Sequence, residues 1–152
     1  NDFYHNVRLI SLGLNELGFL RGDKASILAE DCKEWIYADF AVQCLGGVST
    51  GVYTTDSSEQ LLYQLTDSDS TFLFLDTDEQ LDKYLTIAVD CPKIKKAIVF
   101  EREDLFNFKH EKVNYLDELY KMGEQALQKK PDFFEIEISK NKASDVAIMV
   151  YT

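Results

Sequence analysis

Apolar and polar positions follow two periods along the chain, one typical of helices and one typical of strands. Near the N-terminus the apolar residues are three or four positions apart, as on one face of a helix: Phe3, Val7, Ile10, Leu14 and Leu17. Gly18 is placed to end this helix, because glycine accepts the backbone conformation of a helix C-terminus. The turn at 21–24 then leads to an apolar run at 25–29, which predicts the first strand.

The succession of strand and helix recurs along the rest of the chain. Apolar runs predict further strands at 48–53, 71–75, 97–100 and 146–151. Apolar spacing or longer apolar runs predict helices within the segments 35–45, 57–65, 81–88 and 116–127. The segment 101–114 is polar, and we expect it to be an excursion between a strand and a helix.

Two pairs of residues are spaced like the capping residues of a helix N-terminus. Asp31 is followed after three residues by Glu34, and Ser57 is followed in the same way by Gln60. A helix is therefore expected to start at each pair, with Asp31 and Ser57 as the N-caps. The helix at 35–45 is apolar on nearly all sides, which predicts that it is buried on most sides.

Strands that are apolar on both faces and alternate with helices are typical of a parallel sheet covered on each side. We therefore predict the α/β class, in three layers, with a mostly parallel sheet and helices on both faces. The length of 152 residues suits one domain. The sequence closes on the apolar run 146–151, and a buried strand needs neighbours to cover it, so we expect the chain to be a piece of a longer protein.

The charge balance of the chain argues against one class of partner, the nucleic acids. The chain has 16 Lys and Arg against 27 Asp and Glu, a formal net charge of -11. This surplus repels a phosphate backbone, so we expect no nucleic-acid partner. The three cysteines are odd in number, outside any Cys-x-x-Cys spacing and in or beside apolar stretches, which predicts free thiols in a reducing compartment: Cys32, Cys44 and Cys91.

Asp76 and Asp78 directly follow the expected strand at 71–75. An aspartyl nucleophile and a second Asp for Mg²⁺ occupy such a place in phosphotransferases of the haloacid-dehalogenase type, which this segment resembles. Gln80 stands where those enzymes usually have Thr or Val, and Asp78 also suits the N-cap of the next helix. We favour the structural role, and a Mg²⁺-dependent phosphotransferase stays open as an alternative.

Other candidate motifs indicate structure rather than chemistry. The glycine clusters at 13–18 and 46–51 have the spacing of a Walker loop but lack the Lys and Ser or Thr that must follow, so we expect a helix end and a strand kink. His5 and His110 have no partners at ligand spacing, so no metal site is expected. Trp35 lies on an apolar helix and is expected in the core. We assign no catalytic residue.

Three segments, taken in order, resemble the adenylate-forming (AMP-binding) enzymes, and most closely the long-chain fatty acid CoA ligases. They read Gly-Asp-Lys-Ala-Ser-Ile-Leu-Ala-Glu at 22–30, Glu-Trp-Ile-Tyr-Ala-Asp at 34–39 and Leu-Gly-Gly-Val-Ser-Thr-Gly-Val-Tyr at 45–53. The similarity extends through 72–76, 98–100 and 145–152 and so covers nearly the whole chain. Thr54 stands where that family usually has Pro.

The resemblance implies that Tyr151 and Thr152 open a Ser-, Thr- and Gly-rich loop that holds the phosphates of ATP, which makes these two the expected cofactor-binding residues. It implies ATP and Mg²⁺ as cofactors of the parent protein, and a fatty acid and coenzyme A as its substrates. The parent would form an acyl-adenylate and then a CoA thioester. Residues 1–152 would be a single incomplete α/β subdomain that ends just before the phosphate loop and is inactive alone.

Two further hypotheses remain beside this interpretation. One is an adenylating enzyme for another carboxylic acid, and the other is a non-catalytic α/β binding module. By resemblance we expect a cytoplasmic parent with peripheral membrane contact through its lipid substrate. A sheet edge without a neighbour predicts that the chain associates with itself.

Overall fold

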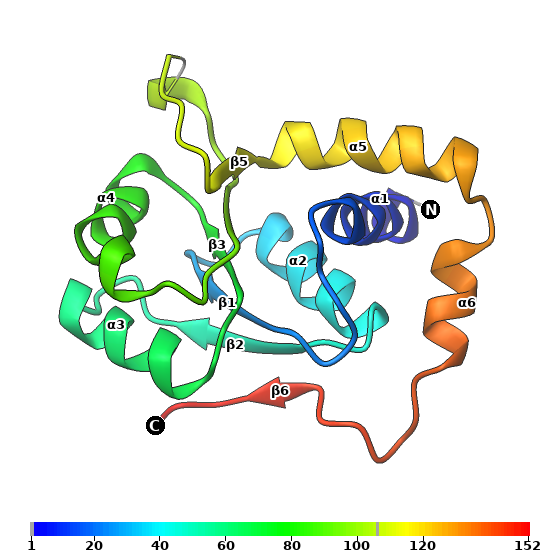
Figure 1. Cartoon of the computed structure of the whole chain (residues 1–152), viewed down its shortest axis with the longest axis horizontal. Coiled ribbons are helices and arrows are strands. Elements are labelled where there is room, and N and C mark those ends of the chain that lie inside the picture. The colour runs from blue at the N-terminus through cyan, green and yellow to red at the C-terminus, as the bar shows by residue number, and fades with distance from the viewer. Residues whose placement is uncertain (1, 106) are drawn as a thin grey trace.

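The computed structural model describes residues 2–105 and 107–152, and its centre is a six-stranded sheet in the order β5-β4-β3-β1-β2-β6 (Figure 1). Every neighbouring pair in the sheet is parallel. The strands are β1 (Lys24–Leu28), β2 (Val48–Val52), β3 (Phe72–Leu75), β4 (Lys96–Val99), β5 (Val113–Tyr115) and β6 (Ile148–Met149). The predicted parallel sheet is confirmed.

Helices cover both faces of the sheet, which gives the three predicted layers (Figure 1). One face carries α1 (Asp2–Glu16), α2 (Lys33–Cys44), α5 (Leu116–Lys129) and α6 (Phe133–Ser139). The other carries α3 (Ser58–Asp67) and α4 (Asp78–Ile87), and single 3₁₀ turns lie at Ala88–Asp90 and Glu103–Leu105. None of the helices in the described ranges combines the length and the apolar character needed to cross a membrane.

Alternation along the strands divides the buried side chains into two cores. In β3, Phe72 and Phe74 pack with the α1 and α2 side chains, whereas Leu73 and Leu75 pack with those of α3 and α4. All four side chains are fully buried, as expected for a central strand that is covered on both faces. The apolar run at 71–75 therefore contributes to both cores.

Helices α1 and α5 cross closely because each places a glycine at the contact. A Cβ atom added at Gly13 would lie 2.6 Å from the carbonyl oxygen of Leu119, and one added at Gly123 would overlap the carbonyl oxygen of Leu9. The two backbones are thus separated by hydrogen atoms only. Gly13 is therefore a packing residue within α1, and Gly18, with φ of 94°, follows the end of that helix as predicted.

Helices begin near all three predicted positions, but only one of the three predicted N-cap residues is confirmed. Ser57 caps α3: its hydroxyl accepts the Gln60 N–H, and the Gln60 side chain accepts the Ser57 N–H. Asp31 and Asp78 are not N-caps, because Cys32 and Thr77 occupy those positions without a side-chain cap bond. Asp78 follows the N-cap Thr77 and lies in the first turn of α4, where its negative carboxylate is stabilised by the positive end of the helix dipole.

The second helix is buried on most sides, as expected, but one stripe of it faces solvent. Ile36 and Phe40 on α2 are 44% and 45% exposed, while Ala38, Ala41 and Val42 are buried. The buried side of α2 faces the sheet and α1, and the outer stripe packs its aromatic rings along the surface. Phe3 and Phe40, for example, meet edge to face with ring centroids 5.2 Å apart.

Three features of the C-terminal half differ from the prediction. β5 begins at the end of the segment 101–114, which was expected to be a polar excursion, and its residues Val113 and Tyr115 are buried on either side of Asn114. α6 was not predicted. The last strand is also shorter and more exposed than expected: only Ile148–Met149 pairs with β2, and Val146, Ile148 and Val150 are 63%, 51% and 77% exposed. β6 is an edge strand in this structure, and the side chains that alternate along one of its faces are left exposed.

Candidate active site at the carboxyl ends of the strands

The crevice beside the carboxyl end of β2 lies where the neighbouring strands β1, β2 and β6 end. The chain leaves β1 toward α2 on one face and leaves the neighbouring β2 toward α3 on the other face. Ligands of open parallel α/β sheets bind outside the carboxyl ends of the strands. The residues that follow β1, β2 and β6 therefore define the candidate site.

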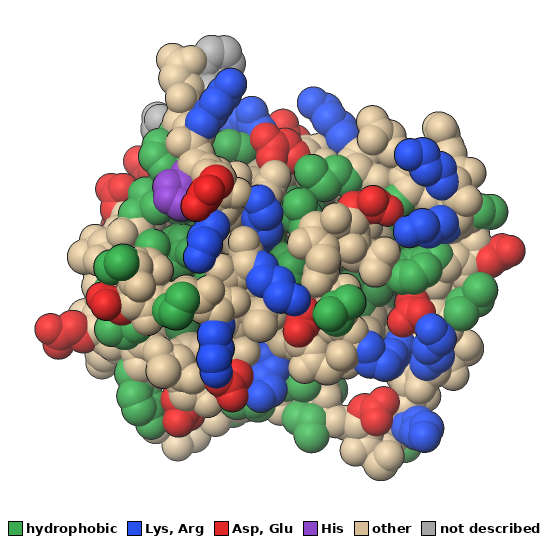
Figure 2. Space-filling model, viewed as in Figure 1, with side chains coloured by type: hydrophobic (Ala, Val, Ile, Leu, Met, Phe, Trp, Pro, Cys, Tyr) green, Lys and Arg blue, Asp and Glu red, His purple; other side chains and the backbone are tan. Residues whose placement is uncertain are grey.

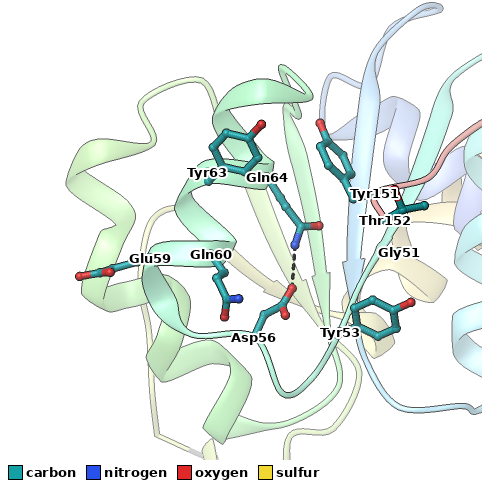
Figure 3. A pocket seen from close by; sticks show the side chains of 9 residues that line it. All are labelled: Gly51, Tyr53, Asp56, Glu59, Gln60, Tyr63, Gln64, Tyr151 and Thr152. Atoms are coloured by element: carbon teal, nitrogen blue, oxygen red, sulfur yellow. Dashed lines mark hydrogen bonds between the residues drawn. The ribbon is translucent and has the colours of Figure 1, made fainter.

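Two cavities flank the end of β2. One of about 420 Å³ lies on the α3 side (Figure 3), and its lining residues are Gly51, Tyr53, Asp56, Glu59, Gln60, Tyr63, Gln64, Tyr151 and Thr152. The other, of about 490 Å³, lies on the α2 side and includes Trp35 and Glu30. Gly51, Tyr53 and Tyr151 line both cavities, so the last residues of the chain lie between the two.

The structure places both sequence-predicted site residues, Tyr151 and Thr152, at this crevice. The Tyr151 hydroxyl donates to Oδ2 of Asp67 at 2.7 Å, and its ring meets Tyr63 edge to face with centroids 6.4 Å apart. Burial and the hydrogen bond to Asp67 raise the pKa of Tyr151 to about 12. The hydroxyl therefore stays protonated near neutral pH and keeps its role as a donor. Thr152 is exposed and lines the α3-side cavity.

A network of polar contacts holds the loop between β2 and α3. The Thr54 hydroxyl donates to the carboxylate of Glu30, and the Thr54 carbonyl accepts from Nζ of Lys83 at 2.5 Å. On the cavity side, Nε2 of Gln64 donates to Oδ2 of Asp56 at 2.6 Å, the contact drawn in Figure 3. These partners come from separate elements and carry no motif, so no local pattern in the sequence distinguishes them.

Asp76 lies at the carboxyl end of β3, as predicted, and its carboxylate joins two strand ends. The residue is 8% exposed, and its Oδ2 accepts the backbone N–H of Glu30 at 2.8 Å, which ties the end of β3 to the end of β1. Asp78 accepts the N–H of Glu79. Within residues 2–105 and 107–152, no group of three His, Cys, Asp or Glu side chains is placed to hold a metal ion. These contacts support the structural role of both aspartates over that of a phosphotransferase.

The remaining candidates lie away from a common centre. His5 is on α1, and His110 lies in the loop before β5, where its Nδ1 accepts the N–H of Lys112. Trp35 packs partly buried against the core, as predicted, and its other side lines the α2-side cavity. The cysteines are free thiols, and burial raises the pKa of each of them: Cys32, Cys44 and Cys91.

The family profile described as "AMP-binding enzyme" matches residues 1–152. The chain belongs to the AMP-binding enzyme family. Among curated members, the long-chain-fatty-acid–CoA ligase ACSBG1 of Rattus norvegicus is 27% identical over 151 residues, which are 99% of this chain and 20% of that protein. FadD15 of Mycobacterium bovis, also named a long-chain-fatty-acid–CoA ligase, is 26% identical over 97% of this chain and 23% of its own length. The chain thus spans about a fifth of the curated relatives that it matches.

Solved structures of AMP-binding enzymes share the fold. A long-chain-fatty-acid–CoA ligase (FadD1) from Archaeoglobus fulgidus superimposes with a TM-score of 0.75 at 14% identity, over 99% of this chain and 27% of that one. The anthranilate CoA ligase AuaEII, in complex with anthranoyl-AMP, gives 0.62 at 22% identity, over 64% of this chain and 19% of that one. At these identities the likeness concerns the fold.

The cavity that Thr152 lines does not by itself fit the phosphates of ATP. Asp56 and Glu59 line the cavity that holds Thr152, and none of its nine described lining residues is Lys or Arg. Lys83, which lies near this loop, donates to the Thr54 carbonyl. On the face shown in Figure 2, basic side chains are mixed with acidic ones and do not form one patch. A triphosphate needs donors and positive charge that the described lining of this cavity does not supply.

Proposed function

We propose that the chain is part of a ligase that activates a long-chain fatty acid with ATP and transfers it to coenzyme A. In the first reaction the fatty acid carboxylate would attack ATP, giving an acyl-adenylate and pyrophosphate. In the second the thiol of coenzyme A would displace AMP and give the thioester. The match of residues 1–152 to the AMP-binding family carries the proposal, supported by relatives that are named long-chain-fatty-acid–CoA ligases.

In this proposal the chain contributes a scaffold rather than reacting groups. The sheet sets the carboxyl ends of β1, β2 and β6 side by side, and Tyr151 and Thr152 extend from β6 at that end. Residues beyond Thr152 would supply the donors for the ATP phosphates and for Mg²⁺. Because the described lining of the cavity beside Thr152 includes no Lys or Arg, we expect residues 1–152 alone to be inactive.

The test is an activity assay on the full-length protein. Exchange of labelled pyrophosphate into ATP is measured with palmitate, anthranilate and phenylalanine as alternative acids, and the thioester is then identified by mass spectrometry after coenzyme A is added. Palmitate-dependent exchange and palmitoyl-CoA are the expected results. Exchange only with another acid would keep the adenylating chemistry and replace the substrate class, whereas no exchange with any acid would contradict the proposal.

The same preparation tests two further expectations. Peripheral membrane contact predicts that the full-length protein sediments with phosphatidylcholine vesicles containing palmitate. A cytoplasmic, reducing location predicts that all three thiols react with a thiol reagent after unfolding without prior reduction. The isolated chain is the control for activity, since it carries the same fold without the segments that follow.

A further inference from the structure

The last residues of the chain are held by a helix that lies far from them in the sequence. The Tyr151 hydroxyl donates to Asp67, 84 residues earlier and the last residue of α3, at 2.7 Å. The Tyr151 ring also rests edge to face on Tyr63, one turn earlier on the same helix. Two side chains of α3 thus contact one residue of the C-terminal segment, as Figure 3 shows for the two tyrosines.

The backbone of this segment has little other support. The ladder between β2 and β6 consists of the pairs Ser49 with Ile148 and Thr50 with Met149, so the register stops two residues before Tyr151. Val150 is 77% exposed and packs little against the core. The direction in which the chain leaves the sheet therefore depends on the Tyr151 side chain.

Helix α3 is a firm base for such a contact. Its N-terminus is closed by the Ser57 and Gln60 capping box, and Leu61 and Leu65 are fully buried beneath it. At its C-terminus the buried hydroxyl of Ser68, next to Asp67, lies 2.7 Å from that of Ser70. A carboxylate on this helix consequently has a fixed position relative to the sheet.

We propose that Asp67 is a positioning residue for the nucleotide-phosphate end of the site, because its hydrogen bond to Tyr151 sets where Thr152 leaves the sheet. The inference rests on the proposed function, in which the segment after Thr152 binds the phosphates of ATP. Asp67 itself would touch neither ATP nor the acid. Replacing Asp67 is expected to raise the KM for ATP and to leave the KM for the fatty acid unchanged.

The kinetic test compares variants of the full-length enzyme. A hydrogen bond of this kind contributes about 0.5–1.5 kcal/mol, so Asp67→Ala and Tyr151→Phe are each expected to raise the KM for ATP about threefold to tenfold, with little change in the KM for palmitate. The double variant should match the single ones, because both remove the same contact. Asp67→Asn keeps an acceptor oxygen, so its KM for ATP should stay close to that of the unaltered enzyme. Asp82 is an exposed aspartate on α4, and Asp82→Ala is the matched control.

A second measurement uses residues 1–152 and does not depend on activity. The heteronuclear NOE of the Tyr151 and Thr152 amides should fall in Asp67→Ala and remain unchanged in Asp82→Ala. Unchanged NOE values in Asp67→Ala, or additive effects of Asp67→Ala and Tyr151→Phe on the KM for ATP, would overturn the positioning role. If the full-length protein lacks exchange activity with every acid, the proposed function fails, and the NOE values still decide the role of Asp67.

Discussion

The close crossing of α1 and α5 predicts the sign of a single substitution, Gly123→Ala. In a helix interior this change by itself stabilises the protein by about 1 kcal/mol, because Ala has the higher helix propensity. Here the new Cβ would overlap the backbone carbonyl of Leu9, a residue only 2% exposed within α1. Overpacking typically costs about 1–3 kcal/mol, and a backbone obstacle in a packed helix places the cost in the upper part of that range.

The net expectation is a loss of about 1–2 kcal/mol in the free energy of unfolding. For a domain of this size that corresponds to a fall in Tm of roughly 2–8 °C. The assay is urea and thermal unfolding followed by far-ultraviolet circular dichroism. Gln125→Ala, at an exposed position of the same helix, is the control and should stay within about 0.5 kcal/mol of the unaltered chain. A Gly123→Ala variant that is more stable by about 1 kcal/mol would refute the close crossing.

Two further predictions concern pH and association. The pKa of three tyrosines is raised to about 12, mainly through burial: Tyr84, Tyr120 and Tyr151. The protonated hydroxyls therefore favour the folded state fully below the unfolded pKa of about 10, and this contribution is lost as pH rises toward 12. An alkaline titration of tyrosinate absorbance should show three tyrosines that ionise near pH 12. In Tyr151→Phe only two tyrosines should ionise in that range. The unpaired outer edge of β6 predicts self-association of the isolated chain, which light scattering should detect and Val150→Lys should reduce, whereas Val89→Lys, at another exposed valine, should not. A monomer at all concentrations would count against the edge contact.

Much of the fold could be predicted because the local signals are strong. Apolar runs marked β1 to β4, and the Ser57 and Gln60 pair marked the start of α3, since both depend on residues that are close in the chain. β5 was missed because an edge strand of three residues with a polar centre carries too little periodicity. The N-caps were misplaced by one residue at Asp31 and Asp78, because acidic residues are favoured throughout the first turn.

Part of the candidate site could likewise be predicted from the sequence, and part of it could not. The resemblance predicted Tyr151 and Thr152 as site residues, and the sheet places them at the carboxyl end beside the β2 crevice. Asp67 was not identified, because nothing local distinguishes it from the other aspartates. Its role emerges only when the fold brings α3 against the end of β6.

By itself the sequence determined the α/β class, most of the element positions and the family, because helix and strand periods and short motifs are written in neighbouring residues. Only the tertiary structure decided the strand order, which stripe of α2 faces solvent, the glycine crossing at Gly123 and the contact of Tyr151 with Asp67. Each of these depends on which surfaces pack together across long stretches of chain. That choice is made by burial of apolar area and pairing of buried polar groups over the whole fold, and no local pattern encodes it.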